Sequence, residues 1–306
     1  TDEEIKDMSD EEYRNNLYSL WTNYCVSESY EPGSTFKPVT VASALEEGVV
    51  KDGDTYVCKG FETVADYKLK CHVFSTIGSH GSLTVEQALM NSCNPYMIHL
   101  ALEMGNSRFA YYQSLFGFGK ITGIDLPGET TGIVYGDRMT TIDAACNSFG
   151  QTINVNMMQM MAAYCSIING GMLYQPHIVK RIESANGEVV KEYKANLVRQ
   201  TITASTSKLL RRYLKNTVEE GTAKKAGVTG YSVAGKTGTA QKGDRKDNKW
   251  IISFIGHAPA ENPKFAIYVV IDEPYGTTGT SGSSADVLTL THNILEKLLP
   301  YMNVYK

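Results

Sequence analysis

The sequence predicts an α+β fold, with helices dominating the first half and a small sheet flanked by helices in the second. Two observations predict it. The stretch "TVEQALMNSCNPYMIHLALEMG" (84–105) has apolar residues at helical spacing. Further on, "KWIISFIGHA" (249–258) and "KFAIYVVID" (264–272) are strand-like runs. Because strands do not alternate with helices along the chain, we do not expect a wound parallel sheet.

The first half is expected to hold helices on either side of a glycine-rich region. Ser9 and Glu12 have the spacing of a capping box, which predicts the start of the first helix. Residues 51–82 lack periodicity, so we expect irregular structure there. The expected elements in chain order are helices over 9–21, 37–48, 84–105 (interrupted at Asn94–Pro95) and 154–171, with a loop over 117–129.

The second half is expected to be richer in strands. Asn186–Gly187 is a strong hairpin turn signal between two strand-like runs. An amphipathic helix over 206–221 precedes three strand candidates, and a last helix follows them. The strand candidates are 230–241, 249–258 and 264–272, and the last helix covers 285–299.

Composition limits the classes of function. The chain has 306 residues, of which 42% are hydrophobic, enough for a substantial core. The net charge of -4 and the absence of a basic block argue against nucleic acid as a partner. No apolar run reaches the length of a membrane span, and we find no signal peptide, so any membrane anchor is expected outside this sequence. Six cysteines are too few for a disulfide scaffold of this length.

The stretch "YEPGSTFKPVT" contains Ser34 and Lys37, one helical turn apart. An ordinary helix start with a surface lysine explains this pair equally well, because serine is a favoured N-cap residue. The alternative is chemical. Residues three apart share a helix face, so the amine of Lys37 could reach the hydroxyl of Ser34 beside the amide donors of the helix start. The pair alone does not decide.

Two further motifs change the interpretation. "NSCN" places Ser92 and Asn94 at a helix break, and "AGKTGTA" places Lys236 on a strand, where Gly238 permits close approach of a ligand. Each motif is weak alone. Together with "STFK", in this order, they form the motif set of penicillin-binding proteins and class A β-lactamases.

The chain resembles the transpeptidase domain of class B penicillin-binding proteins, the acyl-serine transferases that cross-link peptidoglycan. The resemblance runs from about residue 21 to the C-terminus and is closest to the division and sporulation transpeptidases of Gram-positive bacteria. The stretches that carry it are "YEPGSTFKPVT", "SHGSLTVEQALMNSCNPYMIHLALEMG", "FGFGKITGIDLPGE", "SFGQTINVNMMQMMAAYCSIINGG" and "VAGKTGTAQ".

The resemblance implies the penicillin-binding transpeptidase and serine β-lactamase-like fold, an antiparallel sheet flanked by helices plus an all-helical subdomain. We expect residues 1–306 to form one transpeptidase domain, mainly helical over 51–180 and mainly sheet with flanking helices over 181–306. Family members usually begin this domain with a strand hairpin that joins the central sheet. Residues 1–30 instead look helical, so we expect a sheet short of strands.

The resemblance also implies a role for each motif residue. Ser34 would attack the penultimate D-Ala of a stem peptide and Lys37 would act as the base. Ser92 would relay a proton to the leaving amine, and Asn94 would bind the substrate amide and hold Lys37. Lys236, Thr237, Gly238 and Thr239 would bind the terminal carboxylate and, through the amides of Thr239 and Ser34, the oxyanion.

Other functions use the same fold. A serine β-lactamase needs a base that activates water, and no "E-x-x-L-N" segment follows "SCN". A D,D-carboxypeptidase is the main alternative, and a non-enzymatic β-lactam sensor is another; a catalytically silent scaffold is disfavoured because all three motifs are intact. The resemblance implies stem peptides and β-lactams as ligands, a membrane glycosyltransferase as partner, and a place at the extracytoplasmic face of the cell membrane, with anchor and pedestal domain outside this sequence.

A metal site is a separate hypothesis. Cys58, Cys71, His80 and Cys93 lie in one glycine-rich region, and three thiols with one imidazole are a normal zinc set. His80 is preferred over His72 because the family places "HG" just before the "SCN" helix. The alternatives are buried free thiols or a Cys58–Cys71 disulfide. The zinc would be structural, because the serine chemistry needs no cofactor.

Overall fold

Three antiparallel strands in the order β11–β10–β9 form the central sheet of the computed structural model. The structure describes residues 8–243, 246, 249–274 and 283–304. The long strands are β9 (Ala234–Lys242), β10 (Lys249–Ala258) and β11 (Phe265–Asp272). Thr239 pairs with Ile252, and Ile252 with Ile271, so the register is continuous across the sheet. All three strands fall on runs that the sequence predicts as strands.

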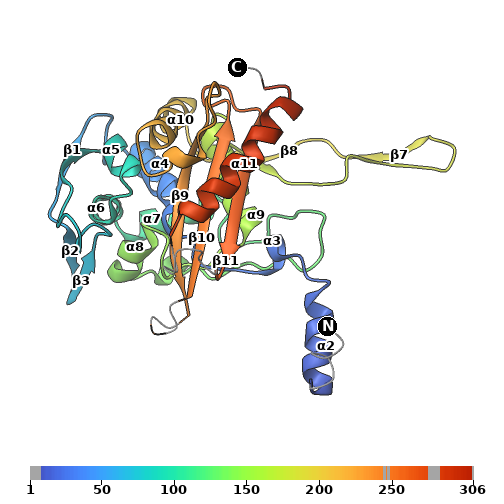
Figure 1. The fold of residues 1–306 in the computed structure, drawn as a ribbon, viewed down its shortest axis with the longest axis horizontal. Coiled ribbons are helices and arrows are strands. Elements are labelled where there is room, and N and C mark those ends of the chain that lie inside the picture. The colour runs from blue at the N-terminus through green and yellow to red at the C-terminus, as the bar shows by residue number, and fades with distance from the viewer. Residues whose placement is uncertain (1–7, 244–245, 247–248, 275–282, 305–306) are drawn as a thin grey trace.

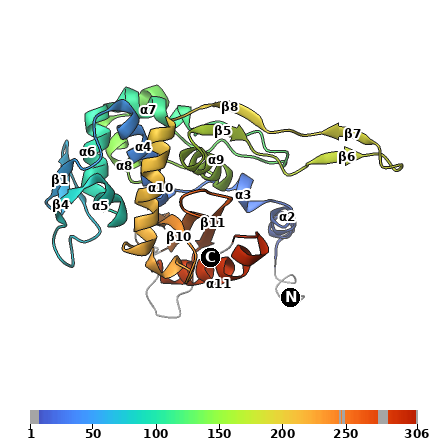
Figure 2. The same cartoon turned by 90° about the horizontal axis from the view of Figure 1, so that it is seen from above.

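Helices cover both faces of this sheet (Figure 2). The apolar side chains of β10 alternate between these faces: Ile252 and Phe254 belong to one buried cluster with α11 (Ala285–Tyr301), whereas Ile255 belongs to the cluster of the other helices. The remaining helices are α2 (Asp10–Ser19), α3 (Tyr24–Ser27), α4 (Lys37–Glu47), α5 (Val85–Met90), α6 (Asn94–Met104), α7 (Asn106–Leu115), α8 (Thr141–Asn147), α9 (Met157–Ile168) and α10 (Ala204–Glu219), with 3-10 turns η1 (Gly33–Phe36), η2 (Gly136–Arg138) and η3 (Lys224–Ala226).

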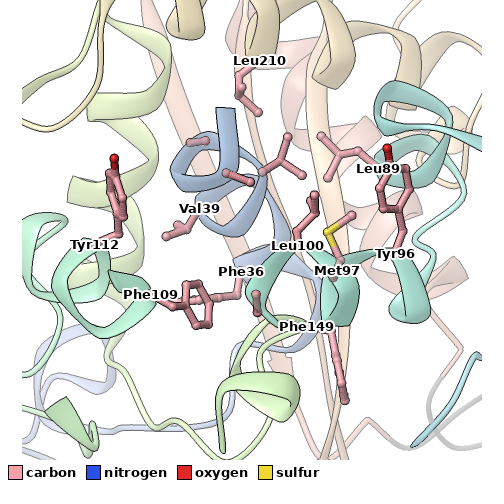
Figure 3. Packing of buried hydrophobic residues seen from close by; sticks show 14 of the residues in the cluster. Phe36, Val39, Leu89, Tyr96, Met97, Leu100, Phe109, Tyr112, Phe149 and Leu210 are labelled. Carbon is pink, nitrogen blue, oxygen red and sulfur yellow. The ribbon is translucent and has the colours of Figure 1, made fainter. Parts of the chain in front are cut away.

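Helix α4 is the centre of the helical part. Its residues from Lys37 to Ala44 are all buried, and it ends at Gly48, whose φ of 76° is the left-handed conformation that glycine adopts readily. Figure 3 shows the side chains that surround it. They come from η1, from helices α5, α6, α7 and α10 and from the loop after α8, and include Phe36, Leu89, Met97, Leu100, Phe109, Phe149 and Leu210. Packing of these side chains therefore fixes the position of the first turn of α4, which begins at Lys37.

The region expected to be irregular contains four short strands, and this corrects the expectation of an all-helical subdomain. Strand β1 (Thr55–Cys58) pairs with β4 (Gly81–Thr84), and β2 (Phe61–Val64) pairs with β3 (Tyr67–Lys70). Four residues are too few to show a periodicity in sequence, and the glycines between them resemble loop composition. Helices α7 and α8 were not expected either. The boundary near residue 180 remains a prediction.

The N-terminal helix α2 and one hairpin lie away from this core (Figure 1). The Ser9–Glu12 capping box of α2 is confirmed, and none of the residues of that helix is buried. Strands β6 (Arg181–Glu183) and β7 (Val189–Glu192) flank the predicted Asn186–Gly187 turn, and β5 (Met172–Gln175) pairs with β8 (Asn196–Gln200) at the base of this arm. Within the described residues, no strand precedes η1, and no helix is both long and apolar enough to cross a membrane.

Candidate active site

Ser34 lies in the 3-10 turn η1, directly against strand β9. Gly33 makes this possible: its φ is +56°, and a Cβ atom on it would lie 2.6 Å from the carbonyl oxygen of Thr239. Its amide donates to the carbonyl of Gly150 at 2.9 Å, which holds the turn from the other side. Any side chain at this position would separate η1 from β9. Ser34 is half-buried and opens into a cleft of about 750 Å³.

The hydroxyl of Ser34 has no hydrogen-bond partner within the described part of the chain, and in particular none in Lys37. The Lys37 amine instead donates to the Ser92 carbonyl at 2.6 Å, the Ser92 hydroxyl at 3.0 Å and the Asn94 side-chain oxygen at 2.7 Å. These three acceptors match the three donors of a lysine ammonium. The structure therefore brings Lys37 together with Asn94 and Ser92, and shows it in the hydrogen bonding of its charged form.

The hydroxyl of Ser92 joins two buried lysines. It accepts from Lys37 at 3.0 Å and from Lys236 at 3.1 Å, and both amines are fully buried. Ser92 has a φ of 54°, a left-handed conformation that is costly for serine and is held here by the α5–α6 turn. Because its oxygen accepts from both sides, the proton of this hydroxyl is free to point into the cleft.

Burial sets the charge state of both lysines. It lowers the pKa of Lys37 to about 8, although Cys71 and Cys93 oppose this shift as negative charges. Burial, helped by the positive charge of Lys37, holds the pKa of Lys236 well below its ordinary value. Neither lysine forms an ion pair with a described carboxylate. The cleft thus combines a lysine that can lose its proton near neutral pH with a second buried amine, Lys236, whose protonated form a bound anion would stabilise.

The start of β9 forms one wall of the cleft. Lys236 donates to the Thr237 carbonyl at 3.2 Å, which fixes the amine beside the threonine hydroxyl. A Cβ atom on Gly238 would lie 2.5 Å from the Ser253 hydroxyl and 2.9 Å from the Pro32 carbonyl, so glycine lets β9 pass between β10 and η1. Thr237 and Thr239 line the cleft with Ser34, Ser92 and Asn94. The sequence motifs that were predicted to form one site therefore meet in space.

Several lining residues were not predicted. They are Lys68, Leu69, Lys70, His72, Phe149, Gln151, Thr222, Gln241, Trp250 and Ser284. Gln151 and Gln241 lie inside stretches quoted for the family resemblance, so position within those stretches was the available signal. The lysines of β3 carried no sequence signal for the site, because charged residues in a short hairpin are usually exposed to solvent without a function.

The four predicted metal ligands come together behind the cleft. The ligand atoms of Cys58, Cys71, His80 and Cys93 all lie within 4.8 Å of one another, and the three thiols are buried and free of disulfides. The His80 Nδ1 atom is 3.5 Å from the sulfur of Cys71 and 3.7 Å from that of Cys58. The hydrogen bond from the Cys93 thiol lowers the pKa of Cys71, against the effect of burial. His72 lies outside this set, and its Nε2 atom is 2.9 Å from the Asn91 carbonyl.

These spacings fit a tetrahedral metal site. Zinc–ligand bonds of about 2.0–2.3 Å require ligand atoms about 3.3–3.8 Å apart at the corners of a tetrahedron. The distances from the His80 Nδ1 atom to the sulfurs of Cys71 and Cys58 fall in this range. Cys93 directly precedes Asn94, and Cys71 directly follows Lys70, whose carbonyl accepts from the Asn94 amide at 3.4 Å. The cluster therefore fixes the backbone that carries Ser92 and Asn94.

Comparison with known proteins agrees with this geometry. The family model described as "Penicillin binding protein transpeptidase domain" matches residues 2–296. The chain is 41% identical over 288 residues to stage V sporulation protein D of Bacillus subtilis, which covers 92% of this chain and 44% of that protein. It is 32% identical over 257 residues to peptidoglycan D,D-transpeptidase FtsI of Escherichia coli, covering 82% of this chain and 41% of the relative.

A solved structure gives the same result. Penicillin-binding protein 3 of Mycobacterium tuberculosis, complexed with aztreonam, superposes with a TM-score of 0.83 at 29% identity, covering 92% of this chain and 65% of that one. The chain spans less than half the length of the two relatives above. These relatives fit the expected class B assignment of division and sporulation type, and the expected fold is confirmed. The chain belongs to the penicillin-binding protein transpeptidase family.

Proposed function

We propose that this protein is a peptidoglycan D,D-transpeptidase that forms an acyl-enzyme through Ser34. The observation that carries the proposal is the hydrogen-bonded set of Lys37, Ser92 and Lys236 beside an unbonded serine hydroxyl. A hydrolase or transferase of this kind needs a nucleophile, a base of suitable pKa, a proton path to the leaving group and donors for the oxyanion. The cleft has a described candidate for each.

In the first half-reaction Ser34 attacks the carbonyl carbon of the penultimate D-Ala. Neutral Lys37 takes the hydroxyl proton, directly or through Ser92, as the Oγ–C bond forms. The oxyanion is bound by the amides of Ser34 and Thr239; the Ser34 amide lies at the start of η1, where N–H groups lack an intrahelical acceptor. Ser92 then passes a proton to the nitrogen of the terminal D-Ala, which leaves as the C–N bond breaks.

The positive end of the cleft selects the substrate. Lys236, with the hydroxyls of Thr237 and Thr239, would bind the terminal carboxylate. The bound carboxylate would offset the free-energy cost of burying two amines that have no described carboxylate partner. In the second half-reaction, the amine of another stem peptide attacks the acyl-enzyme. Ser92 and Lys37 then transfer the protons in the opposite direction, and the Ser34 oxygen leaves. A β-lactam presents a strained amide and a carboxylate in the same relation, so we infer that it acylates Ser34 and remains attached.

The alternative functions differ in the group that accepts the acyl chain from Ser34. The acceptor is an amine in a transpeptidase and water in a D,D-carboxypeptidase. With a stem-peptide donor and an acceptor peptide carrying a free amine, we expect cross-linked product to exceed hydrolysed donor, and Ser34→Ala to yield neither. Chromatography with mass detection quantifies both products. Hydrolysed donor alone would indicate a D,D-carboxypeptidase, and acylation by penicillin without reaction of any donor would indicate a β-lactam sensor.

We further infer that the protein works at the extracytoplasmic face of the cell membrane beside a glycosyltransferase. Donor stem peptides are attached to peptidoglycan strands, and a glycosyltransferase that polymerises such strands would supply them to the cleft. The support is the family match and the relative in Escherichia coli that is named a peptidoglycan D,D-transpeptidase. Co-purification of the full-length protein from solubilised membranes with a glycosyltransferase would support this assembly.

The pKa of Lys37 predicts the pH dependence of acylation. Since the neutral amine is the base and its pKa is lowered to about 8, the second-order rate constant for penicillin should rise up to about tenfold per unit below pH 8 and level off above it. Lys37→Met should lose about a thousandfold of this rate. Stopped-flow measurements with a fluorescent penicillin test both, with the surface variant Lys264→Gln as control. A profile that is flat from pH 6 to 8.5 would exclude Lys37 as the base.

We also propose that Cys58, Cys71, His80 and Cys93 hold a structural zinc ion. The ligand spacing supports it, as does the gathering of three buried thiols around one imidazole. The ion would neutralise thiolates packed close behind Lys37 and tie β1, β3 and the start of α6 together. It would take no part in bond making.

Zinc content and stability test this site. Elemental analysis should find one zinc ion per chain, lost in Cys58→Ser and retained in Cys25→Ser, whose thiol lies outside the cluster. Chelation should lower the Tm by about 5 °C or more, because a bound ion stabilises only the folded state. Metal-free protein with an unchanged Tm and full penicillin reactivity would refute the proposal.

A further inference from the structure

Strand β3 forms a wall of the active-site cleft that the proposed acyl transfer leaves unused. Its residues Lys68 and Lys70 are exposed and line the same cleft as Ser34. The groups assigned to the donor peptide come from η1, α4, β9 and the turn at Ser92, and none comes from β3. The β2–β3 hairpin lies beside α6 (Figure 1). This wall is therefore available to a part of the substrate other than the donor.

Two aromatic rings gather the amines of these lysines. The Nζ atom of Lys68 lies 3.7 Å from the centre of the Phe61 ring and 5.3 Å from that of Phe74, and the Nζ atom of Lys70 lies 4.9 Å from the centre of the Phe74 ring. Phe61 pairs with Lys70 across the hairpin, and Lys68 is two residues before Lys70, so all three lie on one face. Because an ammonium group is attracted to the face of an aromatic ring, the rings restrict the positions of both amines.

No carboxylate balances these two positive charges within the described part of the chain, where neither lysine forms an ion pair. Glu62 pairs with Leu69 across the hairpin, so it lies on the opposite face, where it accepts a hydrogen bond from Tyr56. Asp66, in the turn of the hairpin, is in no described ion pair either. Two like charges held at one aromatic ring repel each other, and a bound anion would offset this repulsion.

The second half-reaction relates these lysines to the acceptor. The attacking amine enters by the reverse of the step in which D-Ala leaves, so it must lie where the leaving nitrogen lay, beside Ser92. From there the cleft continues past Asn94, whose side-chain amide donates to the Lys70 carbonyl at 3.4 Å. The acceptor is itself a stem peptide, which ends in a carboxylate. With its amine beside Ser92, it can extend over β3 and bring that carboxylate to the two lysine amines.

We propose that Lys68 and Lys70 form a subsite for the carboxylate of the acceptor stem peptide. This inference rests on the proposed transpeptidase function. It makes the two lysines specificity-determining residues of the second half-reaction: the acyl-enzyme reacts faster with an acceptor that carries a carboxylate than with a neutral acceptor of the same length.

A matched pair of acceptors tests the subsite. Both are Nα-acetyl-lysyl-D-alanine, in which the lysine side chain supplies the attacking amine; one ends in a carboxylate and the other in a carboxamide. A thioester of benzoyl-D-alanine acylates Ser34, and chromatography with mass detection gives the ratio of transferred to hydrolysed product. Because both products come from the same acyl-enzyme, this ratio does not depend on the rate of acylation.

In metal-loaded wild-type protein at low salt, the ratio should be about fivefold higher for the carboxylate acceptor, and about 0.5 M NaCl should weaken this preference because salt screens exposed charges. The double variant Lys68→Gln and Lys70→Gln should reduce the preference to less than about twofold. The control double variant Lys191→Gln and Lys194→Gln removes two charges from the exposed β6–β7 hairpin and should retain it. Lys191 is a matched control, because its amine lies 4.3 Å from the centre of the Tyr193 ring.

Transfer to the carboxamide acceptor separates the failure of the subsite from the failure of the function. Equal ratios for both acceptors in a wild type that transfers to each, or a preference that salt leaves unchanged, would overturn the subsite alone. A full preference in the Lys68→Gln and Lys70→Gln variant, or an equal loss in the control variant, would overturn the assignment to these lysines. If Ser34 is not acylated, or if the acyl-enzyme transfers to neither acceptor, the transpeptidase proposal fails and the subsite fails with it.

Discussion

The burial of two lysine amines around one serine hydroxyl is the interaction on which the rest of the site depends. Lys37 and Lys236 are both fully buried, and Ser92 accepts a hydrogen bond from each. Both amines are poorly solvated, and Lys236 also experiences the positive charge of Lys37, so each amine holds its proton less tightly than in water. The cleft therefore favours both the loss of a proton from Lys37 and the binding of an anion.

The close approach of the η1 backbone to strand β9 places Ser34 beside these two lysines. Gly33 and Gly238 remove the side chains that would otherwise separate η1 from β9, and Gly150 does the same for the loop that holds η1: a Cβ atom there would lie 2.0 Å from the Gly33 carbonyl. Below them, the buried surface around α4 fixes the first turn, on which Lys37 lies. On the far side, the cysteine cluster anchors the turn that carries Ser92 and Asn94. Three segments far apart in sequence are thus fixed independently.

The sequence predicted the parts whose signals are local. Long apolar runs fixed the expectation of β10, β11 and α11, and the three motifs brought Ser34, Lys37, Ser92 and Lys236 into one predicted site. What it missed depends on tertiary contacts. Strands β1–β4 are too short to show a period, and the ribbons are held by pairing and by the cluster around His80. Spacing on a helix predicted a Ser34–Lys37 contact; the described side chains show Lys37 turned toward Ser92, a partner that no local rule identifies.

The central claim is that the buried amines make Ser34 a nucleophile. Intact-protein mass spectrometry of the metal-loaded protein after incubation with penicillin, followed over hours and mapped by proteolysis, tests it most directly. We predict a lasting one-to-one adduct on Ser34 that Ser34→Ala does not form. An adduct on another residue, an adduct lost within seconds as hydrolysed drug accumulates, or no adduct on a folded sample would contradict this account.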